Sequence, residues 1–181
     1  GELVGLNGET LSSVEAIVKL NEIAAPYGIG RDIHVGDTII GIKGRVGFEA
    51  ASALITLKAH HLLEKHTLSK FQLSMKAQLS EWYGSWLHEG LFLDPAMRDI
   101  EAFLQNSQKM VSGKVFVTLL QYLFILNGIV SEHDLMASKF GSYGEMNNAW
   151  TGEDVKGFSK IVSNSLSIYY QVNKEAKPLE I

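Results

Sequence analysis

A glycine-rich segment between two helical stretches constrains the fold of this chain most. Isoleucine, valine and threonine accumulate between Ile33 and Ile42, and two glycines interrupt them. β-Branched residues favour strands, and glycine inside a strand marks a bulge or the close approach of a ligand or another backbone. The segment therefore predicts a strand pair or a bulged strand that ends at residues 43–45. We expect the functional edge of the chain at residues 28–49.

Apolar residues recur at helical spacing on both sides of this segment. The expected helices cover residues 12–26, 49–65, 69–90, 94–110, 131–140 and 151–170. Ser12 or Ser13, Thr67 or Ser69, and Asp94 precede three of them, where a side-chain oxygen can cap free backbone N–H groups.

The same spacing predicts which helical side chains are buried. In the first helix, the apolar positions at this spacing are Val14, Ile17, Val18, Ile23 and Ala24. Phe71, Trp82 and Trp86 recur at core spacing along the third helix, so we expect them in the core.

A second β-rich stretch, from Gly113 to Asn127, predicts a hairpin that turns near residues 120–122. Residues 141–148 are expected to be a loop, and residues 174–181 a charged tail. Helices outnumber strands and do not alternate regularly with them, which favours the α+β class. We expect mixed helices with a small, mainly antiparallel sheet and a long C-terminal helix extending from the body.

Composition excludes several classes of function. The chain has 16 Lys and Arg against 20 Asp and Glu, a net charge of -4, and no cysteine. The scattered basic residues argue against nucleic acid as a partner. Disulfides, thiolate metal sites and a thiol nucleophile need cysteine. The longest apolar run, residues 115–126, is shorter than the ~20 residues that span a bilayer. We expect a soluble, cytoplasmic protein with no membrane partner.

Neither the glycines nor the histidines predict a nucleotide or metal site. Residues 28–31 (GIGR) follow a helix and lead into a strand, whereas a phosphate loop follows a strand and precedes a helix. We interpret them as a turn that lets the backbone pass close to another group. His60 and His61 point ~100° apart on a helix, so we expect these two and His66 to be structural or exposed. We predict no metal ligand and no catalytic residue.

The glycine-rich segment also carries a resemblance to a known family. Residues 27–45, YGIGRDIHVGDTIIGIKGR, resemble the signature of argininosuccinate synthases, which runs GVGR, then VEN, then GxKSR. Further blocks resemble that family in the same order: Val18–Ala24, Ala59–Glu64, Asp94–Gln108, Val111–Val115 and Gly152–Ser163. Because these blocks span nearly the whole chain, it is identified as a member of the family, as its carboxyl-terminal synthetase and oligomerisation part.

The resemblance implies a ligase of arginine biosynthesis. In the family, ATP with magnesium adenylylates the ureido oxygen of citrulline, and the amine of aspartate then displaces AMP. The family's pyrophosphate loop, SGGxDxS, belongs to an amino-terminal domain that is absent here, so we expect this chain alone to bind no cofactor and to be inactive. Residues 1–150 are assigned to a synthetase-type domain, and residues 151–181 to the oligomerisation helix and tail of a homotetramer.

Two departures from the family bear on the substrate. Gly36 and Phe48 stand where the family has a glutamate and a tyrosine that contact citrulline. A polar or cationic group on the substrate would lose its partners there. One hypothesis is a citrulline whose α-amine carries an acyl group; the other is that Asp37 or Arg45 substitutes by a local rearrangement. The predicted substrate-binding residues are Gly36, Phe48, Asp37, Arg31 and Arg45.

A different class of function stays open. The same scaffold without chemistry would be an assembly or binding module, and the missing carboxylate and hydroxyl favour that alternative. The enzymatic hypothesis requires an open cavity beside the glycine turn.

Overall fold

The computed structural model describes residues 2–138 and 149–173, so the predicted loop at 141–148 and tail at 174–181 lie outside the described residues. The chain divides into two compact units, Gly1–Met136 and Ala137–Ile181. The predicted functional division at residue 150 stays a prediction.

The first unit opens with a small hairpin and a helix. Strands β1 (Gly5–Leu6) and β2 (Glu9–Thr10) pair antiparallel, and α1 (Ser13–Ala24) follows. The Ser12 side chain accepts from the backbone N–H of Glu15, and the Glu15 carboxylate accepts from that of Ser12, which caps the helix. A 3-10 turn, η1 (Ala25–Tyr27), ends α1 at Gly28.

Of the apolar positions at helical spacing in α1, only Ala24 is buried. Ala16, Leu20 and Ala24 are the buried residues, whereas Val14 and Val18 are more than half exposed. α1 packs against α2, and the alanines let the two helices approach closely. Helical spacing identified a helix but not the side of it that the neighbouring helix covers.

Strands β3 (Arg31–Asp37) and β4 (Lys43–Glu49) form an antiparallel hairpin. The prediction of a strand pair is confirmed, but its predicted end is wrong, because residues 43–45 begin the second strand. The chain reverses between Thr38 and Ile42: the Thr38 N–H donates to the Ile42 carbonyl at 3.0 Å, and Gly41 has φ 78°. Glycine takes this left-handed conformation without steric cost.

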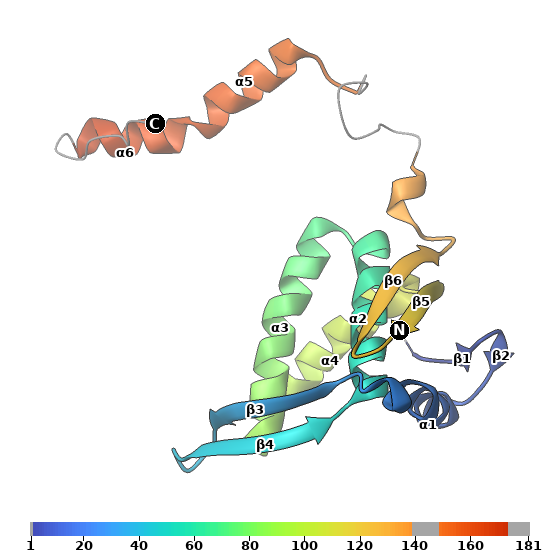
Figure 1. Cartoon of the computed structure of the whole chain (residues 1–181). Helices are drawn as coiled ribbons and strands as arrows, with labels where there is room; N and C mark the ends of the chain where they lie inside the picture. Colours follow the sequence, from blue (N-terminus) through green and yellow to red (C-terminus); the bar gives the residue numbers. More distant parts are fainter. Residues whose placement is uncertain (1, 139–148, 174–181) are drawn as a thin grey trace. The chain divides into compact units, whose positions relative to one another are not determined.

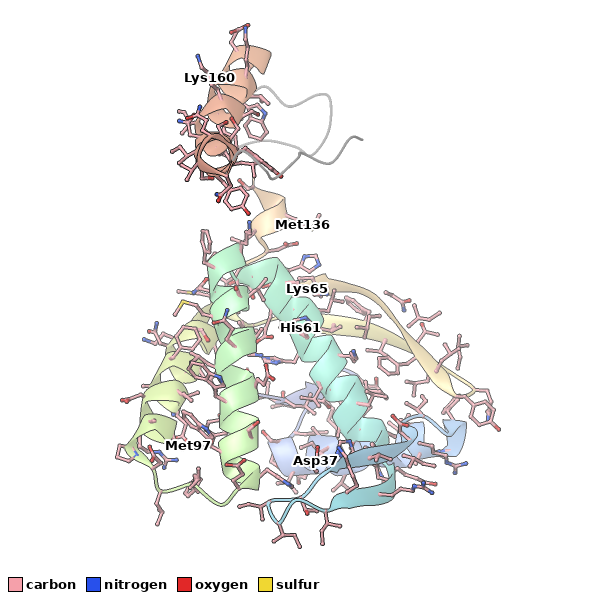
Figure 2. The ribbon with its side chains drawn as sticks, turned by 90° about the vertical axis from the view of Figure 1, so that its left-hand side faces the viewer. Asp37, His61, Lys65, Met97, Met136 and Lys160 are labelled. Carbon is pink, nitrogen blue, oxygen red and sulfur yellow. The ribbon has the colours of Figure 1, made fainter. Side chains whose placement is uncertain are left out.

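Helices α2 (Ala51–Thr67), α3 (Lys70–His88) and α4 (Pro95–Ser107) come next, and a 3-10 turn, η2 (Gln108–Met110), extends α4. Ser69 caps α3 and Asp94 caps α4, as two of the predicted helix starts required. In Figure 1, α3 lies on one side of α2 and the β5–β6 hairpin lies on the other. Figure 2, turned by 90°, shows both α3 and α4 on one side of α2 and the β5–β6 hairpin on the other.

The predicted core position of the aromatic stripe on α3 is wrong. Phe71 is 74% and Trp82 is 54% exposed, and no residue of α3 is buried. Two polar links hold α3 to its neighbours: Lys76 binds Glu64 of α2, and the Tyr83 hydroxyl donates to Glu101 of α4 at 2.8 Å. Leu73 of α3 also packs against a buried cluster, and the aromatic stripe lies on the outside.

Strands β5 (Lys114–Leu120) and β6 (Leu123–Val130) form the predicted second hairpin. Val117, Leu119 and Phe124 pack against a buried cluster. Its members come from α1, from α2 and from the turn, where Ile29 lies between the two glycines: Leu20, Ala24, Ile29, Ala51 and Ile55. A second cluster, Leu63, Leu68 and Val111, lies farther along α2. The β5–β6 hairpin is therefore anchored in the core.

In place of the short helix predicted at 131–140, the described part of that segment holds a 3-10 turn, η3 (Leu135–Ala137).

The second unit contains α5 (Gly152–Val162) and α6 (Asn164–Val172), which form a long helix bent at Ser163. Thr151 caps it by accepting from the Asp154 N–H. The predicted α+β class is confirmed, with two-stranded antiparallel sheets and a long C-terminal helix. Among the residues described, no helix is long and apolar enough to cross a membrane.

Candidate functional site

The candidate site begins at the turn between α1 and β3. Gly28 has φ 70° and Gly30 has φ 76°, a conformation that favours glycine. A Cβ atom on Gly28 would lie 2.9 Å from the Tyr122 ring, and one on Gly30 would lie 2.6 Å from the Ala50 carbonyl carbon. The interpretation of this segment as a turn that allows a close backbone approach is confirmed.

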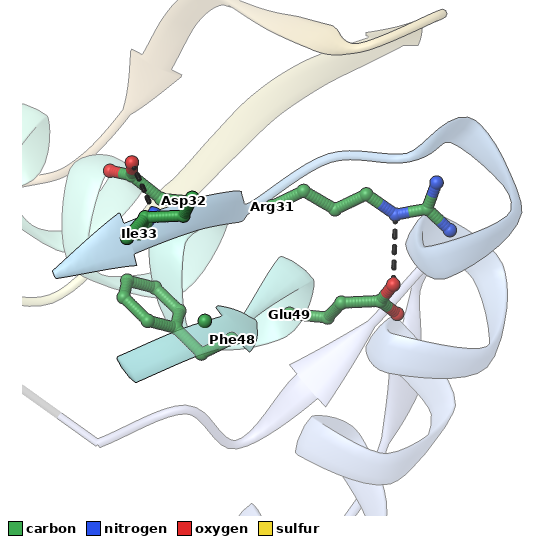
Figure 3. A pocket seen from close by; sticks show the side chains of 6 residues that line it. Arg31, Asp32, Ile33, Phe48 and Glu49 are labelled. Carbon is green, nitrogen blue, oxygen red and sulfur yellow. Dashed lines mark hydrogen bonds and ion pairs between the residues drawn. The ribbon is translucent and has the colours of Figure 1, made fainter. Parts of the chain in front are cut away.

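A shallow, open depression of about 670 Å³ lies beside this turn, at the root of the β3–β4 hairpin. Its lining residues come from the start of β3 and the end of β4: Arg31, Asp32, Ile33, Gly47, Phe48 and Glu49 (Figure 3). The turn itself is covered, but an opening beside it exists, which the enzymatic hypothesis required.

An exposed ion pair crosses the root of the hairpin. Arg31 Nε lies 2.9 Å from Glu49 Oε1, and both side chains are more than half exposed (Figure 3). Such a pair contributes about 1 kcal/mol or less to folding, because solvent screens it. The pair instead limits the directions of both side chains at the depression. Beside it, the Asp32 carboxylate accepts from the Ile33 N–H at 2.7 Å.

The hairpin register divides the five predicted substrate-binding residues between two faces. Directly paired residues share a face and successive residues alternate. Arg31 pairs with Glu49, Val35 with Arg45 and Asp37 with Lys43, which places Arg31, Arg45 and Asp37 on one face. Asp32 pairs with Phe48, and Gly36 with Gly44, on the opposite face.

Two of these five residues line the depression, and they do so from opposite faces of the hairpin. Arg31 and Phe48 line it, whereas Gly36, Asp37 and Arg45 lie nearer the hairpin tip and outside its lining. Asp37 forms an ion pair with Lys43 at 2.7 Å. To replace a carboxylate at position 36, Asp37 would have to leave Lys43 and reach the other face. The binding roles of all five residues stay predictions.

Sequence reasoning missed four of the lining residues: Asp32, Ile33, Gly47 and Glu49. The prediction that a helix begins at Glu49 concealed its pairing with Arg31. The sequence does show opposite charges, Arg31 and Glu49, at the two ends of the glycine-rich segment. Only the register of the hairpin shows that these two residues are directly paired.

A second polar cluster surrounds Glu64, whose side chain is fully buried on α2. Lys76 Nζ donates to its carboxylate at 2.8 Å, and Gln108 Nε2 donates at 2.7 Å. Burial acts to raise the pKa of Glu64, but hydrogen bonds from Lys76 and Gln108 and the charges of His60 and Lys76 together hold the pKa below its ordinary value.

The histidines belong to polar contacts of this kind. His60 lies 2.8 Å from the Gln108 side-chain oxygen, His61 lies 3.4 Å from Glu64, and His66 lies 3.0 Å from Asp134. The predicted structural role is confirmed by these partners. Within residues 2–138 and 149–173, no group of three or more His, Asp or Glu side chains is arranged to hold a metal ion.

Comparison with known proteins gives a consistent result. The model of the family "Arginosuccinate synthase C-terminal domain" matches residues 1–169. Argininosuccinate synthase of Xanthomonas campestris is 37% identical over 174 residues, which cover 96% of this chain and 43% of that protein. The same enzyme of Pyrococcus furiosus is 36% identical over 174 residues, which cover 95% of this chain and 42% of that protein. The chain spans less than half the length of these relatives.

Proposed function

Because the chain belongs to the argininosuccinate synthase family as its C-terminal domain, we propose that it forms part of a ligase that joins citrulline and aspartate with ATP. The family match over residues 1–169 carries this proposal. The open depression beside the glycine turn supports it, since it lies within the segment that resembles the family signature.

The proposed reaction has two steps. The ureido oxygen of citrulline attacks the α-phosphorus of ATP, so that an O–P bond forms and pyrophosphate leaves. The aspartate amine then attacks the ureido carbon and loses a proton; a C–N bond forms, and AMP departs with the ureido oxygen. The contribution of this chain is one wall of the citrulline site, at the root of the β3–β4 hairpin.

The glycine turn of this chain does not fit the phosphates of ATP. The Tyr122 ring fills the space over Gly28, and the Ala50 backbone fills the space beside Gly30. A phosphate needs free N–H groups in an open concavity. We therefore assign ATP and magnesium to the part of the longer enzyme that this chain does not span, and we expect this chain alone to be inactive.

The hairpin geometry favours a substrate without a charged α-amine. Gly36 and Phe48 share one face and themselves offer no carboxylate or hydroxyl. The Asp32 carboxylate on that face accepts from the Ile33 N–H, and Asp37 lies on the other face and pairs with Lys43. An ammonium group facing Gly36 would lose water without gaining an acceptor from that residue. N-acylated citrulline is therefore the proposed substrate form.

Measuring adenylylation by the full-length enzyme distinguishes the two substrate forms. Pyrophosphate release is measured with plain and with N-acylated citrulline, each with and without aspartate. A clear preference for the acylated form supports the proposal, whereas a clear preference for plain citrulline removes it and leaves the ligase assignment in place.

We also propose that α5 and α6 are the assembly arm of a homotetramer. Their apolar side chains are exposed in the described unit: Val155, Phe158, Ile161, Val162, Leu166, Ile168, Tyr169 and Val172. Burying such a stripe against other subunits is favourable by about 25 cal/mol per Å² of apolar surface. Sedimentation of the full-length protein as a tetramer would agree with this role, and a lone monomer would contradict it.

A further inference from the structure

Tyr122 has a backbone conformation that its residue type rarely adopts. Its φ is 66°, and among the described residues other than glycine only Asn7 shares a positive φ. Asparagine tolerates this region because its short side chain can bond the local backbone, but tyrosine has no such compensation. A residue of this kind persists only where its surroundings over-determine its conformation.

The surroundings of Tyr122 are the glycine turn that precedes β3. Its backbone N–H donates to the Tyr27 carbonyl at 2.7 Å. A Cβ atom placed on Gly28 would lie 2.9 Å from Cδ1 and Cε1 of the Tyr122 ring, and 3.9 Å from Nη1 of Arg31. One edge of the Tyr122 ring thus lies over the turn, although the residue as a whole is 71% exposed, and Arg31, the first residue of β3, lies near the same point.

The two hairpins differ in how firmly they are held. Leu119 and Phe124, which flank the β5–β6 turn, pack against the buried cluster. Alternate residues of β5 and β6 are half-buried, whereas every residue of β3 and β4 except Gly36 and Gly44 is exposed. The root of the β3–β4 hairpin is fixed on one side by the Ala50 N–H, which donates to the Gly30 carbonyl at 2.9 Å. Tyr122 covers the other end of the same short turn.

We propose that Tyr122 is a positioning residue for the substrate site: its ring, pressed on Gly28, sets the direction in which β3 leaves the core and so places Arg31 and Phe48. This inference rests on the proposed function for its catalytic consequence. Its structural part is that the β5–β6 hairpin, through Tyr122, holds the root of the β3–β4 hairpin in place. We call this contact the clamp, and it is argued from the contacts of Tyr122 alone.

Two variants test the ring without adding backbone strain to that of the wild type. Tyr122→Gly adopts the positive φ without cost but has no ring, whereas Tyr122→Phe keeps both the ring and the strain. Amide hydrogen exchange of this chain then reports local opening. We expect exchange over residues 31–49 to accelerate about tenfold in Tyr122→Gly and to be unchanged in Tyr122→Phe, with α4 as an internal reference that stays protected. Unchanged exchange over residues 31–49 in Tyr122→Gly would overturn the clamp.

Kinetics of the full-length enzyme test the consequence for the site. A positioning role predicts that Tyr122→Gly raises KM for the citrulline substrate about tenfold and leaves KM for ATP unchanged. Tyr122→Phe, which keeps the ring, should have the KM values of the wild type. Unchanged KM for citrulline in Tyr122→Gly would overturn the inference even if exchange accelerates. A wild-type enzyme with no ligase activity on either form of citrulline would defeat the proposed function, and the exchange experiment would still decide whether the clamp exists.

Discussion

The ammonium of Lys76 lies 2.7 Å from Oε1 and 2.8 Å from Oε2 of Glu64, and so joins α3 to the only fully buried carboxylate within residues 2–138 and 149–173. The Glu64 side chain has no exposed surface, and Lys76 is about one quarter exposed. Because α3 buries no residue of its own, this pair is a principal attachment of the helix.

Removing the lysine should therefore be costly. Lys76→Met leaves a buried carboxylate without its counter-charge, and such losses cost about 3–5 kcal/mol of the free energy of unfolding. The measurement is urea unfolding followed by circular dichroism. The double variant Lys76→Met with Glu64→Gln removes both charges and should recover most of the loss. Equal unfolding midpoints for Lys76→Met and the wild type would contradict the buried pair.

Acid should weaken the same attachment. The pKa of Glu64 is lowered in the folded chain, so its stabilising contribution is present above its ordinary value of 4.5 and is lost as the pH falls through the lower folded value. His60, His61 and Lys76 are the basic side chains that face it. Unfolding free energies measured between pH 7 and pH 3 should fall more steeply below pH 4.5 in the wild type than in Glu64→Gln. Parallel curves would show that Glu64 does not titrate in this way.

Gly30 should tolerate no side chain. Gly30→Ala places a methyl group 2.6 Å from the Ala50 carbonyl carbon at φ 76°, and the combined strain should cost about 2 kcal/mol or more. Gly47→Ala is the matched control on the same hairpin, because no atom lies within 4 Å of its added methyl and its φ is not in the left-handed region. Chemical denaturation measures both. A smaller loss for Gly30→Ala than for Gly47→Ala would refute the close approach.

The Arg31–Glu49 pair should contribute little to stability. Both side chains are more than half exposed, so a double-mutant cycle of Arg31→Ala and Glu49→Ala should give a coupling energy of about 1 kcal/mol or less. Denaturation of the four proteins of the cycle measures that energy. A coupling of several kcal/mol would show that the pair is buried in solution, for example by assembly.

Local signals in the sequence predicted much of the fold. Ser69 and Asp94 are side chains whose hydrogen bonds close within two or three residues, so their effect on helix starts is independent of the rest of the molecule. The glycine turn was predictable for a similar reason, since the constraint on a positive φ acts at the residue itself. The β5–β6 hairpin follows from its alternating residues.

What failed were predictions that depend on the partners of an element. The spacing of Phe71 and Trp82 marks one face of α3, but Lys76 and Tyr83 contact α2 and α4 from another face of the helix. The depression depends in the same way on the register of β3 against β4, which brings Glu49 opposite Arg31. Sequence periodicity does not contain that register.

The KM for the citrulline substrate in the full-length enzyme tests most directly whether the root of the β3–β4 hairpin is a substrate site. Phe48→Ala removes an aromatic side chain from the depression, and Phe116→Ala removes one of similar exposure from β5. A lost apolar contact of about 1.4 kcal/mol corresponds to a tenfold change in affinity. We predict that Phe48→Ala raises KM about tenfold and that Phe116→Ala leaves it unchanged; equal KM values for the two variants and the wild type would contradict the account.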